Sequence, residues 1–229
     1  MGWPGMSNRH VAIDGPSASG KTVVSHALAN RLGILYLDTG AMYRAVAFLA
    51  LRNGVELDND TALVEMFARH SLGIVADESA YNGYRVLVDE TDVSARLTQP
   101  EVTAAVSTVA AAPHVRAALV DRQRAIAAAE PVVMAGRDIG TVVLPDARYK
   151  FFLTASLAER AKRRTLELAA SGIDVSGSDI GAGLAERDRL DMARATSPLR
   201  AADDAVRIDS TELDIPGVIE RMLAQMSRR

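Results

Sequence analysis

The feature that most constrains this chain is the run Gly15-Pro16-Ser17-Ala18-Ser19-Gly20-Lys21-Thr22, which has the pattern G-x-x-x-x-G-K-T. It follows an apolar run at residues 10–13 and precedes a helical pattern at 23–32. In that setting, glycines let backbone N–H groups converge on phosphate oxygens at a helix N-terminus, where the helix dipole also favours an anion. The motif therefore predicts nucleoside triphosphate binding. Lys21 is expected to reach the β- and γ-phosphates, and the Thr22 hydroxyl is expected to ligate Mg²⁺.

Short apolar runs alternate with longer helical patterns along most of the chain. The runs suited to buried parallel strands lie at residues 10–13, 34–37, 132–134, 149–153 and 206–208. This alternation predicts an α/β fold with a doubly wound, mainly parallel five-stranded sheet. Residues 72–76 and 84–88 flank Asn82-Gly83 and predict an antiparallel hairpin, and two helices are expected after it, at about 101–110 and 114–128.

These elements suggest how the chain is organised. We expect a P-loop core at residues 9–69 and 131–229, with a lid at about 156–185, and an insertion at 70–130. The insertion is expected to carry substrate contacts, because loops and insertions at the ends of parallel strands are where such sheets bind ligands. Residues 1–8 are expected to be a disordered tail, and both Met1 and Met6 fit as the starting residue.

Composition excludes several classes of protein. The chain has no cysteine, which rules out disulfides, iron–sulfur clusters, thiol nucleophiles and Cys-ligated zinc, and favours the reducing cytoplasm. The four histidines have no spacing of a helical metal site. A net charge of −3, with no basic run longer than residues 162–164, argues against nucleic acid as a partner. The sequence shows no signal peptide pattern and no apolar run long enough to span a membrane, so no membrane partner is expected. We also expect the protein to be a monomer.

A phosphate loop alone does not name a reaction, because GTPases, motors and small-molecule kinases share it. The sequence has no Asn-Lys-x-Asp guanine reader and no apolar strand ending in a motor-type acidic pair. A chain of 229 residues has room for little beyond a small-molecule kinase. Arginines beyond the loop favour an enzyme over a nucleotide-binding switch without turnover, because a switch needs no second anion site.

Two arginine clusters suit phosphoryl transfer between phosphates, which brings two polyanions together and needs cationic groups on both sides. Arg187, Asp191 and Arg194 are spaced i, i+4, i+7 and so share one helical face. A second cluster follows the apolar run at 149–153, and residues 160, 163 and 164 share a face there. The alternative for both clusters is a solvated helix face with ion pairs.

Five segments make the chain resemble the bacterial cytidylate (CMP) kinase family, from about Val11 onward. They lie at residues 13–17 with the rest of the phosphate loop, 36–44, 136–143, 159–164 and 186–199. The resemblance implies a nucleoside-monophosphate kinase core with an enlarged monophosphate-binding insertion and a short lid. It further implies ATP with Mg²⁺ as donor and CMP, together with dCMP, as acceptor; UMP or AMP is the alternative acceptor. Ala18 and Thr22 stand where many family members have glycine.

The resemblance also implies roles for individual residues. The acceptor phosphate would be held by Arg44, Arg137, Arg187 and Arg194, the sugar hydroxyls by Asp191, and Thr39 would lie near the monophosphate. The pyrimidine would be surrounded by Ser107, Arg116 and Asp138. An ionised carboxylate only accepts hydrogen bonds, so Asp138 can accept from the cytosine amine but repels the uracil carbonyl. Catalysis would rest on Lys21, Arg137 and the lid residues Arg160, Arg163 and Arg164, which close over the transferring phosphate and expel water.

Overall fold

The computed structural model describes residues 9–77, 79–80, 83–170 and 177–228. The tail predicted at residues 1–8, Asn82 of the predicted hairpin turn, and residues 171–176 of the predicted lid lie outside them. The chain divides into two compact units, one formed by residues 1–35 and 131–229 and the other by Tyr36–Glu130.

A five-stranded sheet with strand order β2-β6-β1-β7-β8 confirms the predicted α/β fold. β1 lies at its centre and pairs in parallel with β6 and β7, and β7 pairs in parallel with β8. All four residues of β1 are buried, as expected for a strand covered on both faces. The strands are β1 (Val11–Asp14), β2 (Leu35–Asp38), β6 (Val132–Gly136), β7 (Tyr149–Thr154) and β8 (Val206–Asp209).

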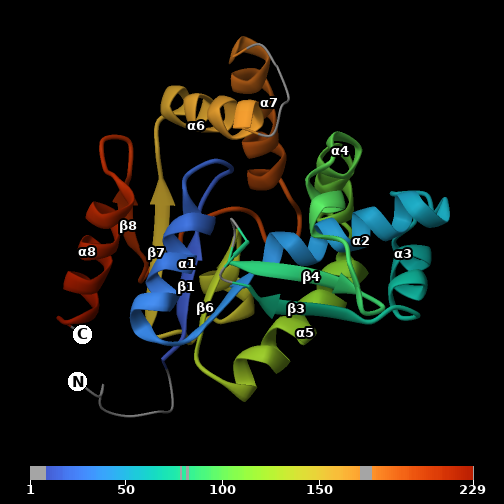
Figure 1. Cartoon of the computed structure of the whole chain (residues 1–229), viewed down its shortest axis with the longest axis horizontal. Coiled ribbons are helices and arrows are strands. Elements are labelled where there is room, and N and C mark those ends of the chain that lie inside the picture. Colours follow the sequence, from blue (N-terminus) through green and yellow to red (C-terminus); the bar gives the residue numbers. More distant parts are fainter. Residues whose placement is uncertain (1–8, 78, 81–82, 171–176, 229) are drawn as a thin grey trace. The chain divides into compact units, whose positions relative to one another are not determined.

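The helices of the first unit surround the phosphate loop. α1 packs on β6 and on α8, while α6 and α7 pack against each other beyond the carboxyl end of β7 (Figure 1). Because the carboxyl ends of parallel strands are where α/β sheets bind ligands, this places α6 and α7 at the functional end of the sheet. The helices are α1 (Lys21–Leu32), α6 (Leu157–Ala170), α7 (Gly177–Met192) and α8 (Ile215–Met226), with a helical turn η2 (Ile139–Val143) after β6.

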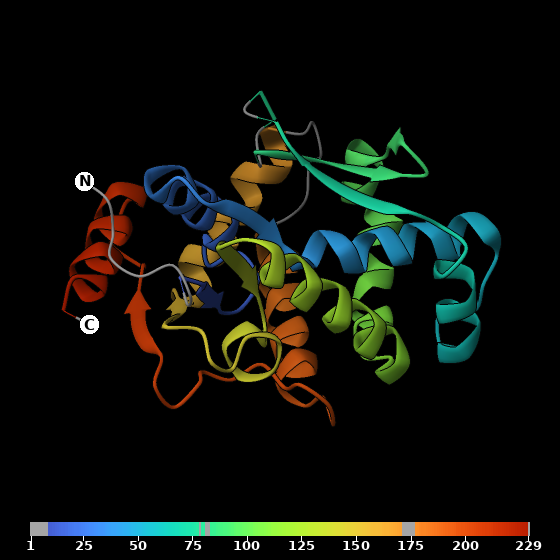
Figure 2. The same cartoon turned by 90° about the horizontal axis from the view of Figure 1, so that it is seen from below.

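The second unit contains the predicted antiparallel hairpin. β3 and β4 pair with Leu72 opposite Val88 and Ala76 opposite Tyr84, and a short third strand, β5, extends this sheet. Figure 2 shows α2 running between the β3–β4 ribbon and α5. The elements are α2 (Thr39–Asn53), α3 (Asp60–Phe67), β3 (Leu72–Ala76), β4 (Tyr84–Val88), β5 (Thr91–Asp92), η1 (Ser94–Thr98), α4 (Pro100–Val109) and α5 (Pro113–Ala129).

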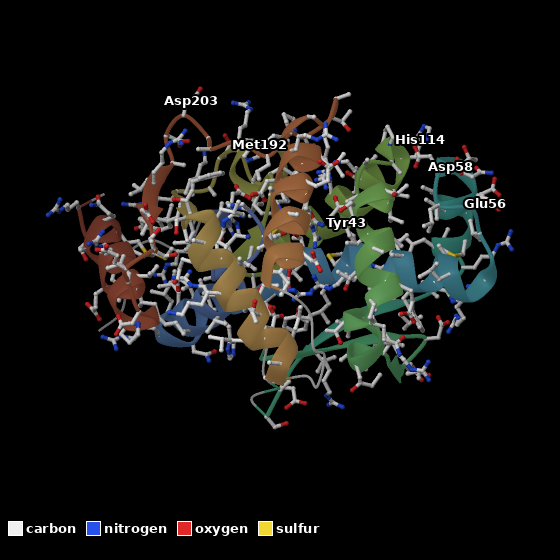
Figure 3. The ribbon with its side chains drawn as sticks, turned by 90° about the horizontal axis from the view of Figure 1, so that it is seen from above. Tyr43, Glu56, Asp58, His114, Met192 and Asp203 are labelled. Carbon is white, nitrogen blue, oxygen red and sulfur yellow. The ribbon has the colours of Figure 1, made fainter. Side chains whose placement is uncertain are left out.

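The second unit begins at residue 36, whereas the predicted insertion begins at residue 70. The difference has a physical reason: α2 packs on α4 and α3 packs on α5, so two helices before residue 70 share a core with the segment after it. Asp60, at the start of α3, accepts hydrogen bonds from the backbone N–H groups of His114 and Val115. It thereby caps α5, whose own N-cap residue provides no side-chain bond. Figure 3 marks His114 there and Tyr43 on α2.

Within the described residues, no single helix has both the length and the apolar character needed to cross a membrane. The pair α4 and α5, bent by 96° at their junction, passes that test of length and composition only when the two helices are taken together.

Candidate active site

The phosphate loop occupies residues 15–20 between β1 and α1. Gly15 has φ +153°, and a Cβ built on it would lie 2.1 Å from the carbonyl oxygen of Leu153, so only glycine fits beside β7. Gly20 closes the loop with φ +90°. Ala18 also adopts a left-handed conformation, with φ +57°, which costs a non-glycine residue about 1–2 kcal/mol. A glycine at this position would avoid that strain.

Lys21 is buried and folds back over the loop. Its Nζ donates a 2.6 Å hydrogen bond to the carbonyl oxygen of Pro16 and a 3.4 Å bond to Oγ of Ser19. The lysine thus lies within the loop, where its ammonium group can exchange these partners for the oxygens of a phosphate that enters. Thr22 is the second residue of α1.

Asp14 is the last residue of β1, and its carboxylate faces η2. Its Oδ1 accepts a 2.8 Å hydrogen bond from the backbone N–H of Ile139, and its Oδ2 accepts one of 2.8 Å from Gly140. Complete burial raises the pKa of Asp14 to about 7, and the nearby charge of Asp138 acts in the same direction. The two backbone hydrogen bonds and Lys21 oppose this rise without cancelling it.

A cluster of buried charges joins the segment after β6 to α7. Asp191 is 1% exposed; its Oδ2 accepts a 2.8 Å hydrogen bond from Nε of Arg137, and its Oδ1 pairs with Arg194. Burial alone would raise the pKa of Asp191, but Arg137 and Arg194, with a further contribution from Arg187, hold it below its ordinary value. The structure therefore brings together these four residues, as the helical spacing and the resemblance predict.

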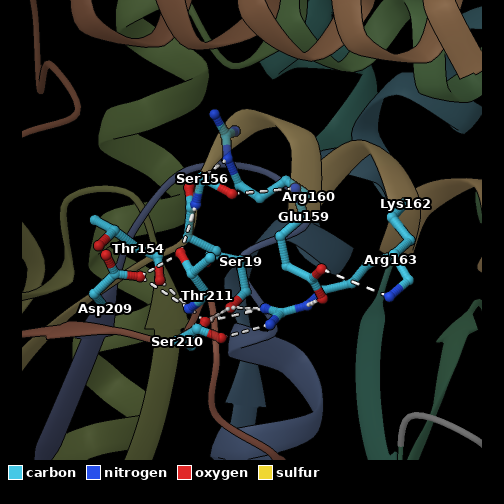
Figure 4. A network of polar contacts seen from close by, with 11 residues as sticks. Ser19, Thr154, Ser156, Glu159, Arg160, Lys162, Arg163, Asp209, Ser210 and Thr211 are labelled. Carbon is cyan, nitrogen blue, oxygen red and sulfur yellow. Dashed lines mark hydrogen bonds and ion pairs between the residues drawn. The ribbon is translucent and has the colours of Figure 1, made fainter.

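Two of the three predicted lid arginines reach the phosphate loop. Arg160 donates from Nη1 to the carbonyl oxygen of Ser17 at 3.2 Å and pairs through the same atom with Asp188 of α7 at 2.7 Å. Arg163 donates from Nη1 to the carbonyl oxygen of Ser19 at 3.4 Å (Figure 4). Arg164 instead pairs with Glu167 on the same helix at 2.9 Å.

Ser210 is a site residue that the sequence analysis did not find. It follows β8, is 3% exposed, and accepts hydrogen bonds from Arg163 at Oγ (3.0 Å) and at its carbonyl oxygen (2.6 Å). Its hydroxyl lies 3.0 Å from the carbonyl oxygen of Thr154 and 3.3 Å from that of Ser19. Glu159 holds the other side of Arg163 at 2.9 Å (Figure 4). Ser210 thus ties α6 to the loop, and no local sequence signal marks a serine for this long-range role.

The second unit contains a separate cluster around the start of α2. The Asp38 carboxylate accepts from the backbone N–H of Gly40 (2.9 Å), from Nη2 of Arg44 (3.1 Å) and from the Tyr84 hydroxyl (2.8 Å). Burial is the largest single influence on the pKa of Arg44 and lowers it, but the charges and hydrogen bonds of Asp38 and Tyr84 together outweigh burial, so the pKa is raised. Thr39 is buried as the first residue of α2. Thr39 and Arg44, both predicted near the acceptor phosphate, therefore belong to one local cluster.

The predicted base-reading residues are divided between the units. Arg116 is 4% exposed on α5, donates to the carbonyl oxygen of Ala110 at 3.1 Å, and stacks with its guanidinium 5.4 Å from the Tyr43 ring centre. Ser107 is half-buried on α4 in the same unit. Asp138 lies in the first unit, buried at the start of η2. Their joint role around one base stays a prediction.

A phosphate loop of this sequence at the end of β1, bonded to Arg137 after β6 and to Arg160 and Arg163 of α6, defines a P-loop kinase of the small-molecule type. Solved structures agree with this fold. The chain matches a shikimate kinase from Acinetobacter baumannii with a TM-score of 0.50 at 13% identity, covering 97% of this chain and 95% of that one. A shikimate kinase from Bacteroides thetaiotaomicron matches with the same TM-score at 12% identity, covering 96% and 99%.

Sequence comparison narrows the class. Residues 11–228 match the cytidylate kinase family. A cytidylate kinase from Pelotomaculum thermopropionicum is 47% identical over 218 residues, which cover 95% of this chain and 96% of that protein. One from Pseudomonas aeruginosa (strain LESB58) is 46% identical over 219 residues, covering 96% and 95%. The chain belongs to the cytidylate kinase family.

Proposed function

We propose that this chain transfers the γ-phosphoryl group of ATP to CMP, and to dCMP, giving ADP and CDP or dCDP. The observation that carries the proposal is the buried cluster of Arg137, Asp191 and Arg194, joined to the phosphate loop by a 2.7 Å hydrogen bond from Nη2 of Arg137 to Oγ of Ser17. A donor loop with a second cationic site beside it suits transfer from one phosphate to another.

The chemistry needs no nucleophile from the protein, because an oxygen of the acceptor phosphate attacks the γ-phosphorus. The chain supplies position and charge. Lys21 exchanges the carbonyl oxygen of Pro16 for the β- and γ-phosphates of ATP, and Arg137 and Arg194 hold the acceptor phosphate in line. Arg44 and Arg187 complete the acceptor set. Arg160, Arg163 and Arg164 are assigned to the closing lid, which excludes water.

Magnesium fits the donor set of this loop. Mg²⁺ keeps several waters and binds through one or two protein groups together with the phosphates of the nucleotide. The Thr22 hydroxyl, one residue beyond Lys21, is an oxygen donor of this kind. When bound with ATP, Mg²⁺ neutralises charge on the β- and γ-phosphates. No set of protein ligands elsewhere in the chain would be needed to bind the ion.

Selection of cytosine is assigned to Asp138, Arg116 and Ser107. The carboxylate of Asp138 accepts from the exocyclic amine, and Arg116, which only donates, matches the ring nitrogen and carbonyl. Asp191 is assigned to the sugar hydroxyls. We propose the segment 70–130, together with α2 and α3 that pack on it, as the monophosphate-binding region, about 156–185 as the lid, and the rest of residues 9–69 with 131–229 as the core. A cytoplasmic monomer without nucleic-acid or membrane partners fits the absence of cysteine and the net charge of −3.

The test is ADP release from ATP and Mg²⁺, measured with a coupled assay over CMP, dCMP, UMP, AMP and GMP. The proposal predicts that kcat/KM for CMP and dCMP exceeds that for UMP about 10-fold or more. A higher kcat/KM for UMP or AMP would move the chain to another monophosphate kinase. ATP binding without ADP release for any of the five acceptors would indicate a nucleotide-binding switch.

A further inference from the structure

Ser17 makes two different contacts with two different arginines. Its Oγ accepts a 2.7 Å hydrogen bond from Nη2 of Arg137, and its carbonyl oxygen accepts one of 3.2 Å from Nη1 of Arg160. Ser17 is 8% exposed and Arg160 is 7% exposed, so their contact lies largely out of water, whereas the Arg137 side chain is 19% exposed and its contact with Ser17 is partly buried. One residue of the phosphate loop is thus held by the acceptor cluster and by the base of α6.

Both arginines also form ion pairs with aspartates of α7. Arg137 pairs with Asp191 at 2.8 Å, and Arg160 pairs with Asp188 at 2.7 Å. Asp188 is 8% exposed and Asp191 is 1% exposed. Buried, geometrically defined pairs of this kind resist rearrangement more strongly than surface ion pairs do. The phosphate loop and α7 are therefore linked at Ser17 by two routes, a largely buried one through Arg160 and a partly buried one through Arg137.

The hydroxyl of Ser17 is suited to link two ligands because it has one proton and two lone pairs. Accepting from Arg137 uses a lone pair and leaves the hydroxyl's own proton to be donated to an oxygen of the nucleotide that fills the loop. A hydroxyl that accepts from a charged donor becomes a stronger donor itself, and the effect works in both directions. Donor phosphate at the loop would therefore fix the hydroxyl, and the fixed hydroxyl would hold Arg137 in place for the acceptor phosphate.

We propose that Ser17 is a positioning residue that couples the donor and acceptor sites, so that bound ATP increases the affinity for the acceptor nucleotide through Arg137. This rests on the proposed function, because it needs two phosphate ligands. Thermodynamic linkage requires that the bound acceptor increase the affinity for ATP by the same factor. Couplings between sites are commonly on the order of 5-fold or more, which is the size expected here.

The experiment measures the dissociation constant of CMP by calorimetry, with and without a saturating non-hydrolysable ATP analogue and Mg²⁺. In the unmodified chain, the analogue should lower the dissociation constant of CMP, so that the ratio of the values without and with the analogue is about 5-fold or more. In Ser17→Ala, which has no acceptor for Arg137, that ratio should fall below about 2-fold. Ser17→Thr retains a hydroxyl and should recover most of the coupling. Ser25→Ala, a buried serine of α1, is the matched control and should keep the full ratio.

Equal ratios in the unmodified chain and in Ser17→Ala would overturn the proposal, as would a ratio near one in the unmodified chain. Should Ser17→Ala fail to fold, Arg137→Lys answers the same question. Lysine keeps the positive charge but cannot bridge Ser17 and Asp191 with one planar group, so the ratio of CMP affinities with and without the analogue should fall below about 2-fold. If UMP or AMP proves to be the acceptor, the ratio of dissociation constants is measured with that nucleotide. The coupling role of Ser17 and the choice of CMP as acceptor are therefore tested separately.

Discussion

Arg137 and the buried Asp191 form an ion pair in which Nε of the arginine lies 2.8 Å from Oδ2 of the aspartate. Asp191 simultaneously pairs with Arg194 through its other oxygen. One carboxylate thus holds two guanidinium groups in defined positions. If these arginines bind the acceptor phosphate as proposed, it meets two oriented donors rather than two flexible side chains, which reduces the entropy lost on binding.

Arg194→Ala should weaken the acceptor site far more than the donor site. Loss of a charge-assisted hydrogen bond costs about 1.5–3 kcal/mol, so we expect KM for CMP to rise about 10-fold or more while KM for ATP changes less than about 2-fold. Steady-state kinetics with each substrate varied in turn measures both. Arg189→Ala removes an exposed arginine of α7 that pairs with Glu186 and should change neither value. Equal losses for ATP and CMP would assign this part of α7 to the donor side.

Lys21→Ala should nearly abolish turnover and leave the fold intact. The substitution removes the charge nearest the transferring group, and loss of one such stabilising group costs about 100- to 1,000-fold in kcat. Rapid-quench assays give kcat, and circular dichroism reports the fold. Lys162→Ala, which removes a lysine side chain that is 71% exposed, is the control. A folded Lys21→Ala protein with nearly normal kcat would remove this lysine from the mechanism.

Ser210→Ala should destabilise the base of α6. It removes the Oγ that accepts from Arg163 and donates toward the carbonyl oxygens of Thr154 and Ser19. Leaving a buried donor without its partner costs about 1–3 kcal/mol, which we expect as a loss in the free energy of unfolding in urea. Ser227→Ala, an exposed serine after α8, should lose less than about 0.5 kcal/mol. If both variants lose the same small amount, Ser210 does not tie α6 to the phosphate loop.

Asp14 should titrate near pH 7, which can be followed through the ¹³C shift of its carboxyl group and assigned with Asp14→Asn. Burial raises its pKa from 3.8 to about 7, so the native chain binds this proton in a pH range where the unfolded chain has lost it. Its contribution to stability therefore declines as pH rises from about 4 to about 7. Asp191 should behave oppositely and stay ionised below its ordinary range. A midpoint near 4 for Asp14 would show that its hydrogen bonds and the charge of Lys21 cancel the effect of burial on its pKa.

Much of this fold could be predicted from sequence, because its signals are local. The five strands were predicted to within a few residues from short apolar runs, and Asn82-Gly83 between residues 72–76 and 84–88 indicated the hairpin. The two-residue strand β5 is too short to show a pattern. α3 was missed even though Asn59 caps it by accepting from the backbone N–H of Ala62, a start signal that the sequence does contain.

The site was predictable where its spacing is helical and not where it depends on distant pairing. Arg187 and Asp191 lie on α7 as their helical spacing predicts, and Arg194, two residues beyond the end of that helix, still reaches Asp191. Ser210 lies 47 residues from Arg163 in sequence, and no pattern links the two. The start of the second unit at residue 36 depends in the same way on packing of α2 against α4.

The most direct test of CMP as the acceptor is the ratio of kcat/KM for CMP to that for UMP, measured at saturating ATP in the unmodified chain and in Asp138→Ala. Uracil sets a carbonyl oxygen against the carboxylate of Asp138 and leaves a buried acceptor unpaired, which costs about 1–3 kcal/mol. The unmodified chain should therefore favour CMP by about 10- to 100-fold, and Asp138→Ala should lose mainly activity on CMP and narrow the ratio. An unmodified chain that prefers UMP, or an unchanged ratio in a folded Asp138→Ala protein, would contradict this account.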